Sequence, residues 1–171
     1  MKHPMLQSIV VLTVICLIAS VLLAAVNSVT APMIAEAAEA KTQASLKAVL
    51  PDATGFTEVA LPDDAPATVA GVWKDDGGSG YAVALSTTSS YSSAPMTFTV
   101  GIGADGTVLA VEMTNYSETK DFGAYPESYS GIGADGVADM DLYAGVTYSS
   151  TAFRDAVADA FAVIETMERG A

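Results

Sequence analysis

The hydrophobic and polar positions divide the chain of 171 residues into three unlike parts. The first is an apolar run, residues 8–26 (SIVVLTVICLIASVLLAAV), that contains no charged side chain. At about 1.5 Å per helical residue this run spans roughly 28 Å, close to the hydrocarbon thickness of a membrane, about 30 Å. The pattern predicts a transmembrane helix. A cleaved signal peptide is the alternative, although its apolar region is usually only about 7 to 15 residues long.

The second part has the composition of a helix followed by a loop. Thr30 and Pro32 offer a cap and an early proline, and the alanine-rich stretch after them predicts a membrane-exit helix that Pro51 ends. Residues 52–68 contain prolines and acids with little periodicity, which predicts a connecting loop.

Alternating apolar positions in the third part predict two β-hairpins. The first pairs residues 68–74 with 81–88 around DDGGSG, and the second pairs 96–102 with 107–114 around GADG. Both connections are rich in the residues that favour tight turns. An antiparallel sheet is therefore expected.

The C-terminal segment carries the spacing of an amphipathic helix. Its apolar residues recur at intervals of four, four and three: Phe153, Val157, Phe161 and Ile164. The expected fold class is α+β, with a single N-terminal transmembrane helix before a domain of antiparallel sheet and flanking helices. We expect residues 1–30 to hold the N-terminal tip and transmembrane helix, 31–66 the exit helix and loop, and 67–171 the folded domain.

The hexapeptide GIGADG occurs twice, at residues 101–106 and 131–136. It matches G-x-G-x-x-G, the letters of a dinucleotide-binding loop, which needs a helix to begin at its last glycine. A predicted strand follows the first copy, and a broken, acidic segment follows the second. The first copy is therefore predicted to be a hairpin turn, and the second a loop on the approach to Asp141.

Charge and composition exclude several classes of function. The formal net charge is −13, from 20 acidic and 7 basic residues, which argues against a nucleic-acid partner. His3 is the only histidine, and Cys16, the only cysteine, lies inside the apolar run. Histidine-based triads and the usual zinc sites are therefore not expected in the folded domain, and its chemistry should come from a cofactor.

The charges that flank the apolar run indicate its orientation. Lys2 and His3 precede the run, whereas Glu36 and Glu39 are the first charged residues after it. We expect a single-pass protein of the cell (inner) membrane, with a cytoplasmic N-terminus and an extracytoplasmic C-terminal domain.

A candidate phosphate site precedes the C-terminal helix, in residues 141–150 (DLYAGVTYSS). A turn of small residues at a helix N-terminus presents backbone N–H groups and the positive end of the helix dipole. Gly145 gives such a turn its backbone freedom, and Thr147 adds a hydroxyl. On these residues alone, a capped turn without a ligand is the favoured interpretation.

Residues 141–147 (DLYAGVT) resemble the flavinylation motif D-x-x-[ST]-G-A-T. This motif belongs to the FMN-binding domain found in the G subunit of the Rnf electron-transport complex and in the C subunit of the sodium-pumping NADH:quinone reductase. In that family a flavin transferase uses FAD to join the last threonine to the FMN phosphate. The resemblance implies covalent FMN on Thr147, although Ala144 and Val146 depart from the usual residues. It places these residues around the cofactor: Asp141, Gly145, Val146, Tyr148 and Ser149.

Two further segments resemble the same family. Residues 12–37 look like the anchor of the Rnf G subunit, and residues 115–127 (NYSETKDFGAYPE) are similar to the family segment H-x-E-T-P-G-L-G, which lies against the flavin. The resemblance implies flavin contacts from Glu118, Thr119, Phe122 and Gly123. Lys120 and Phe122 stand where the family usually has Pro and Leu. Without the resemblance, residues 118–119 would be interpreted as a polar turn.

The resemblance implies a membrane-anchored electron-transfer subunit of an ion-translocating ferredoxin:NAD oxidoreductase, the Rnf complex. Its partners would be the other membrane subunits, the flavin transferase that matures it and membrane lipid. FMN accepts one or two electrons, so the protein would contribute its position and electrostatics. Two alternatives stay open: a free-standing extracytoplasmic flavoprotein electron carrier, and a flavin-free structural subunit of a membrane complex.

Overall fold

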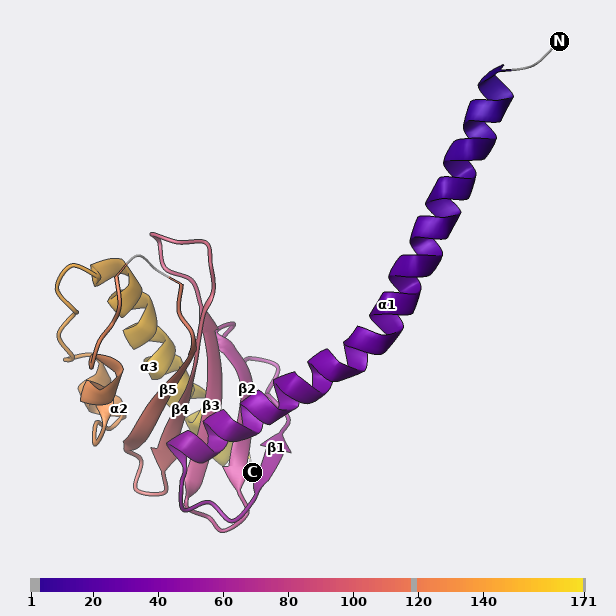
Figure 1. Cartoon of the computed structure of the whole chain (residues 1–171). Helices are drawn as coiled ribbons and strands as arrows, with labels where there is room; N and C mark the ends of the chain where they lie inside the picture. Colours follow the sequence, from indigo (N-terminus) through magenta and orange to yellow (C-terminus); the bar gives the residue numbers. More distant parts are fainter. Residues whose placement is uncertain (1–3, 118–119, 171) are drawn as a thin grey trace. The chain divides into compact units, whose positions relative to one another are not determined.

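The computed structural model describes residues 4–117 and 120–170 of the chain (Figure 1). The chain divides into two compact units, Met1–Thr42 and Gln43–Ala171, which are described separately. The second unit contains a five-stranded sheet together with the last turns of the N-terminal helix.

Helix α1 runs without interruption over Pro4–Val49. Its large apolar side chains between Ile9 and Ile34 are exposed, and it is long and apolar enough to cross a membrane. No separate helix begins at Thr30: α1 continues through this residue, and the Thr30 hydroxyl donates to the carbonyl of Val26, 3.0 Å away. Pro32 lies within the helix, where it removes a single backbone hydrogen bond.

The sheet is an antiparallel meander in the order β1-β2-β3-β4-β5. Each strand pairs with the next along the chain, so Val83 of β3 lies opposite Val100 of β4, which lies opposite Val111 of β5. Both predicted hairpins are present, as β2–β3 and β4–β5. The strands are β1 (Phe56–Val59), β2 (Val69–Asp75), β3 (Gly80–Thr87), β4 (Met96–Gly103) and β5 (Val108–Asn115).

The segment expected to be only a loop, residues 52–68, contains the edge strand β1. All four residues of β1 pair with β2, from Phe56 opposite Asp75 to Val59 opposite Val72. A strand of four residues is too short to show an alternating pattern. β1 is a strand because it forms backbone pairs with β2.

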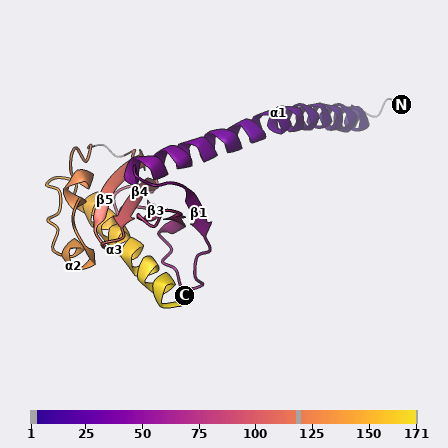
Figure 2. The same ribbon diagram turned by 90° about the horizontal axis from the view of Figure 1, so that it is seen from below.

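The two faces of the sheet are covered by different helices (Figures 1 and 2). Helix α3 (Thr147–Gly170) packs on one face, where Phe153, Val157 and Val163 join the apolar residues of β2–β5 in the main core. The end of α1 packs on the other face through Leu46, Val49 and Leu50. The predicted amphipathic C-terminal helix is therefore the element that closes the core.

The end of α1 lies so close to the sheet that one strand position requires glycine. A Cβ atom on Gly101 of β4 would lie 2.3 Å from the carbonyl oxygen of Val49. The first glycine of the first GIGADG copy thus makes room for a helix backbone.

The two GIGADG copies lie side by side at the end of the sheet. Thr107 forms an isolated bridge with Gly133, and the Gly131 N–H donates to the Val108 carbonyl over 2.7 Å. The first copy ends β4 and turns into β5, with Gly106 at φ 75°. The second was expected to be a loop, but it contains the short helix α2 (Ala134–Val137). A 3-10 helix, η1 (Pro126–Tyr129), precedes it.

Candidate functional site

A tight turn connects the loop after α2 to the first residue of α3. The N–H of Val146 donates to the carbonyl of Tyr143 over 3.0 Å, and Gly145 adopts a φ of 83°. Residues other than glycine rarely adopt this left-handed conformation, so Gly145 allows the turn. Helix α3 then begins at Thr147.

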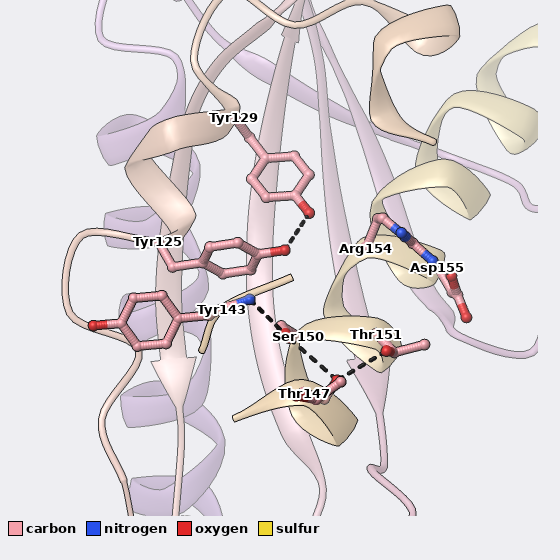
Figure 3. A network of polar contacts seen from close by, with 8 residues as sticks. All are labelled: Tyr125, Tyr129, Tyr143, Thr147, Ser150, Thr151, Arg154 and Asp155. Carbon is pink, nitrogen blue, oxygen red and sulfur yellow. Dashed lines mark hydrogen bonds and ion pairs between the residues drawn. The ribbon is translucent and has the colours of Figure 1, made fainter. Parts of the chain in front are cut away.

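Ser150 ties this turn to the first turn of α3 (Figure 3). Its Oγ atom accepts a hydrogen bond from the backbone N–H of Tyr143 at 3.2 Å and donates to the carbonyl of Val146 at 2.9 Å. The side chain of Ser150 is fully buried. It therefore joins the two ends of the turn from inside the protein.

Thr147 is exposed at the start of α3, whereas Ser149 and Ser150 are buried. The carbonyl of Thr147 accepts a hydrogen bond from the Thr151 hydroxyl over 2.8 Å (Figure 3). The first N–H groups of an α-helix have no acceptor within the helix, and they lie at the positive end of its dipole. Thr147 thus combines an accessible hydroxyl with a setting that favours an anion.

A cleft of about 200 Å³ surrounds Thr147. Two of its lining residues come from elsewhere in the chain: Tyr91 lies in the loop between β3 and β4, and Lys120 follows β5. The other lining residues belong to the turn and to the start of α3: Gly145, Val146, Thr147, Tyr148 and Ser149. The cleft therefore brings together an ammonium group, two tyrosines and the threonine hydroxyl.

Two models of protein families match the chain. The model of the RnfG N-terminal region matches residues 1–49, and that of the FMN-binding domain matches residues 91–162. The chain belongs to the RnfG family. It is an FMN-binding electron-transfer subunit of the Rnf type, with one N-terminal helix suited to single-pass anchoring in a membrane.

The match to the FMN-binding domain includes the whole lining of the cleft. A search of curated proteins gives no match to the chain, so the assignment to the RnfG family rests on the two family models. The cleft fits a phosphate ester, because an exposed hydroxyl, a helix N-terminus and an ammonium group converge there. FMN, the cofactor that the matched domain binds, would supply one- and two-electron chemistry there.

The structure brings five of the sequence-predicted site residues into the cleft: Gly145, Val146, Thr147, Tyr148 and Ser149. The other described residues of the prediction do not line it. Asp141 is exposed at the end of the loop that precedes the turn. Glu118 and Thr119 lie outside the described residues.

Phe122 and Gly123 follow Lys120 in the chain but do not line the cleft. Phe122 is only 2% exposed, and its ring stacks on that of Tyr116 with centroids 4.7 Å apart. Gly123 has a φ of 52°, and a Cβ atom there would lie 3.4 Å from the Tyr143 hydroxyl. Phe122 therefore belongs to the core, and Gly123 to a turn that approaches Tyr143.

The sequence prediction missed Tyr91 and Lys120 as lining residues. Tyr91 lies in a serine-rich loop, where the local sequence carries no signal of its long-range position. In the sequence, Lys120 was noted only because it stands where the family segment usually has Pro. A basic residue in a chain with a net charge of −13 was the one signal that could have identified it.

A buried cluster of aromatic rings underlies the turn (Figure 3). The hydroxyls of Tyr125 and Tyr129 are hydrogen-bonded at 2.9 Å, and both rings pack against Phe153 of α3. Burial is the main cause that raises the pKa of each tyrosine above its ordinary value. The pair therefore stays uncharged at neutral pH and forms a rigid floor below the start of α3.

Proposed function

We propose that this RnfG-family protein carries FMN covalently on Thr147 and transfers electrons within an ion-translocating ferredoxin:NAD oxidoreductase complex. The observation that carries the proposal is the position of Thr147, whose side chain is exposed in the cleft at the N-terminus of α3. The other membrane subunits of the complex are the proposed electron donors and acceptors. Because FMN exchanges one or two electrons, it can connect carriers of both kinds.

The burial of the neighbouring hydroxyls supports Thr147 as the attachment residue. Ser149 is 1% exposed and Ser150 is 0% exposed. The hydroxyl of Ser150 is also occupied by three hydrogen bonds around the turn. Neither serine offers a transferase the access that Thr147 offers.

The attachment step requires FAD and a flavin transferase. The Thr147 oxygen forms a bond to the phosphorus on the flavin side of the pyrophosphate, the P–O bond to the bridging oxygen breaks, and AMP leaves. The hydroxyl proton passes to a base of the transferase. The product is a phosphodiester, which keeps the flavin in place outside the cytoplasm, where free FMN would be diluted.

The proposed topology follows from the charges that flank the apolar run of residues 8–26. Residues 1–30 would form the cytoplasmic tip and the span, residues 31–66 would lead away from the cell membrane, and residues 67–171 would hold FMN outside the cytoplasm. A topology reporter fused to the C-terminus is expected to be active only in its extracytoplasmic form. Activity of a cytoplasmic reporter at that end would contradict this orientation.

Intact-mass analysis tests the proposed attachment. The full chain, co-expressed with a flavin transferase, should gain the mass of one FMN with the loss of water and should fluoresce in a denaturing gel. Thr147→Ala should abolish both signals, Thr147→Ser should keep part of them, and Ser149→Ala is the matched hydroxyl control. Flavin that remains covalently bound in Thr147→Ala would refute the choice of residue. An unmodified chain that gains no mass would refute covalent attachment altogether.

A further inference from the structure

We propose that the Lys120 ammonium binds the phosphate of the flavin at Thr147, an inference that rests on the proposed function. Lys120 and Thr147 line the same cleft. The Nζ atom of Lys120 lies 2.8 Å from the position that a Cβ atom on Gly145 would occupy. The ammonium therefore lies over the glycine that opens the turn, within the space next to the attachment residue.

The backbone at Lys120 is fixed to the core. The hydroxyl of Tyr116 donates to the Lys120 carbonyl over 2.6 Å, and the Tyr116 ring stacks on the buried ring of Phe122. Phe122 in turn packs edge-on against Phe153 of α3, with centroids 5.5 Å apart. These contacts hold the base of the lysine side chain at a constant place relative to the start of α3.

The charge of Lys120 has no protein partner in the described structure. Among residues 4–117 and 120–170, the two arginines Arg154 and Arg169 form ion pairs with carboxylates, and the Lys120 ammonium forms none. Lys47 and Lys74 form no ion pair among these residues either, and Lys120 is the lysine that lines the cleft. A phosphodiester carries one negative charge, and a charge-assisted hydrogen bond from an ammonium would stabilise it.

The identity of residue 145 agrees with this role. Its positive φ alone favours glycine, but the ammonium also lies where a larger residue would place its side chain. Gly145 thus leaves the space between Lys120 and Thr147 open for a phosphate group. The first residues of α3 line the same cleft, so the positive end of the helix dipole adds to the charge of the ammonium.

Two measurements on the full chain test this inference. The first is the initial rate of flavin attachment by purified transferase at increasing FAD concentrations. Lys120→Met should lower the rate about tenfold, as expected for the loss of one charge-assisted hydrogen bond, and Lys120→Arg should restore most of it. Lys47→Met is the matched control, because Lys47 is exposed on the α1 segment that packs on the opposite face of the sheet.

The second measurement uses the unchanged lysine, so it does not depend on how a variant folds. Acylation of Lys120 by a small amine reagent, followed by peptide mass spectrometry, should be several-fold slower in the flavin-carrying chain than in Thr147→Ala. Acylation of Lys47 should be equal in the two proteins. Equal acylation of Lys120 with and without flavin would overturn the inference about Lys120. Equal attachment rates for Lys120→Met and Lys47→Met would also overturn it. Neither result would contradict covalent attachment of FMN to Thr147. Failure of the unmodified chain to gain flavin would overturn the proposed function itself.

Discussion

The backbone N–H of Tyr143 donates to the Oγ atom of Ser150 across the turn that presents Thr147, and the two atoms are 3.2 Å apart. Because Ser150 is fully buried, water cannot replace its hydroxyl. We expect Ser150→Ala to lower the free energy of unfolding by about 1–2 kcal/mol and to reduce the flavin bound per chain. Thermal unfolding of the detergent-solubilised full chain and intact-mass analysis measure the two effects.

Thr151→Val is the control for the Ser150 prediction. Its hydroxyl also bonds to a backbone carbonyl of α3, that of Thr147, but it does not reach across the turn. Valine has a similar shape, so this variant should change the stability by less than 0.5 kcal/mol, roughly the effect of an ordinary surface substitution. Equal losses of flavin in the two variants would show that the connection between Tyr143 and Ser150 does not position the site.

Gly145→Ala is expected to strain the turn at the attachment site. At a φ of 83° an alanine costs about 1–2 kcal/mol, and its methyl group would displace the flexible end of Lys120. Gly133→Ala is the matched control, since Gly133 has a φ of −89° and its added Cβ would lie 3.5 Å from the Gly106 carbonyl oxygen, an ordinary contact. The melting temperature of Gly145→Ala should be clearly lower than that of Gly133→Ala. If Gly145→Ala melts like Gly133→Ala, the turn has no need for glycine.

Much of the fold could be predicted from local patterns in the sequence. Apolar positions with a period of two indicated β2–β5, and a spacing of three and four indicated α3, because each of these elements buries one face against the same core. The first GIGADG copy was correctly predicted to be a hairpin turn because a strand pattern follows it, whereas the second, predicted to be a loop, begins the short helix α2. What the pattern could not show was that the second copy pairs with Thr107 and Val108, the residues that directly follow the first copy.

The remaining features depend on contacts between distant segments. β1 exists because β2 offers it a pairing edge, and α1 continues through Pro32 because the hydrogen bonds on either side of the proline persist. In the cleft, the turn residues were predictable as a contiguous motif. Tyr91 and Lys120 were not, since only the folded sheet brings their loops to the start of α3.

Gly101→Ala is expected to disturb the packing of α1 on the sheet. Its Cβ would lie 2.3 Å from the Val49 carbonyl oxygen and 2.9 Å from the Val49 Cβ, and these atoms belong to a helix that cannot yield by a simple rotamer change. Overpacking of this kind costs about 1–3 kcal/mol. We expect a lower melting temperature and faster proteolysis near residues 43–50. Unchanged proteolysis there would mean that the helix end does not depend on close contact with Gly101.

Asp75 makes the stability of the folded domain depend on pH. Its carboxylate is almost fully buried and accepts hydrogen bonds from the Ser79 hydroxyl at 2.6 Å, the Ser79 N–H at 2.9 Å and the Thr54 N–H at 2.9 Å. The bond from the Ser79 hydroxyl is the main cause that holds the pKa of Asp75 well below its ordinary value. The carboxylate thus joins the loop before β1 to the turn between β2 and β3.

A lowered pKa in the folded state means that the unfolded chain binds the proton first as the pH falls. The stabilisation by Asp75 is therefore complete above its unfolded pKa, about 3.9, and is lost as the pH falls below that value toward the folded pKa.

Asp75→Asn should melt at a lower temperature at pH 7, because an amide replaces an acceptor of several N–H and O–H donors. The difference in melting temperature between the native chain and Asp75→Asn should shrink as the pH is lowered from 5 to 2, the approximate range over which Asp75 of the unfolded chain, but not of the folded chain, becomes protonated. Asp63→Asn, at an exposed loop position, is the control and should follow the native curve. A difference that stays constant with pH would show that the charge of Asp75 does not stabilise this junction.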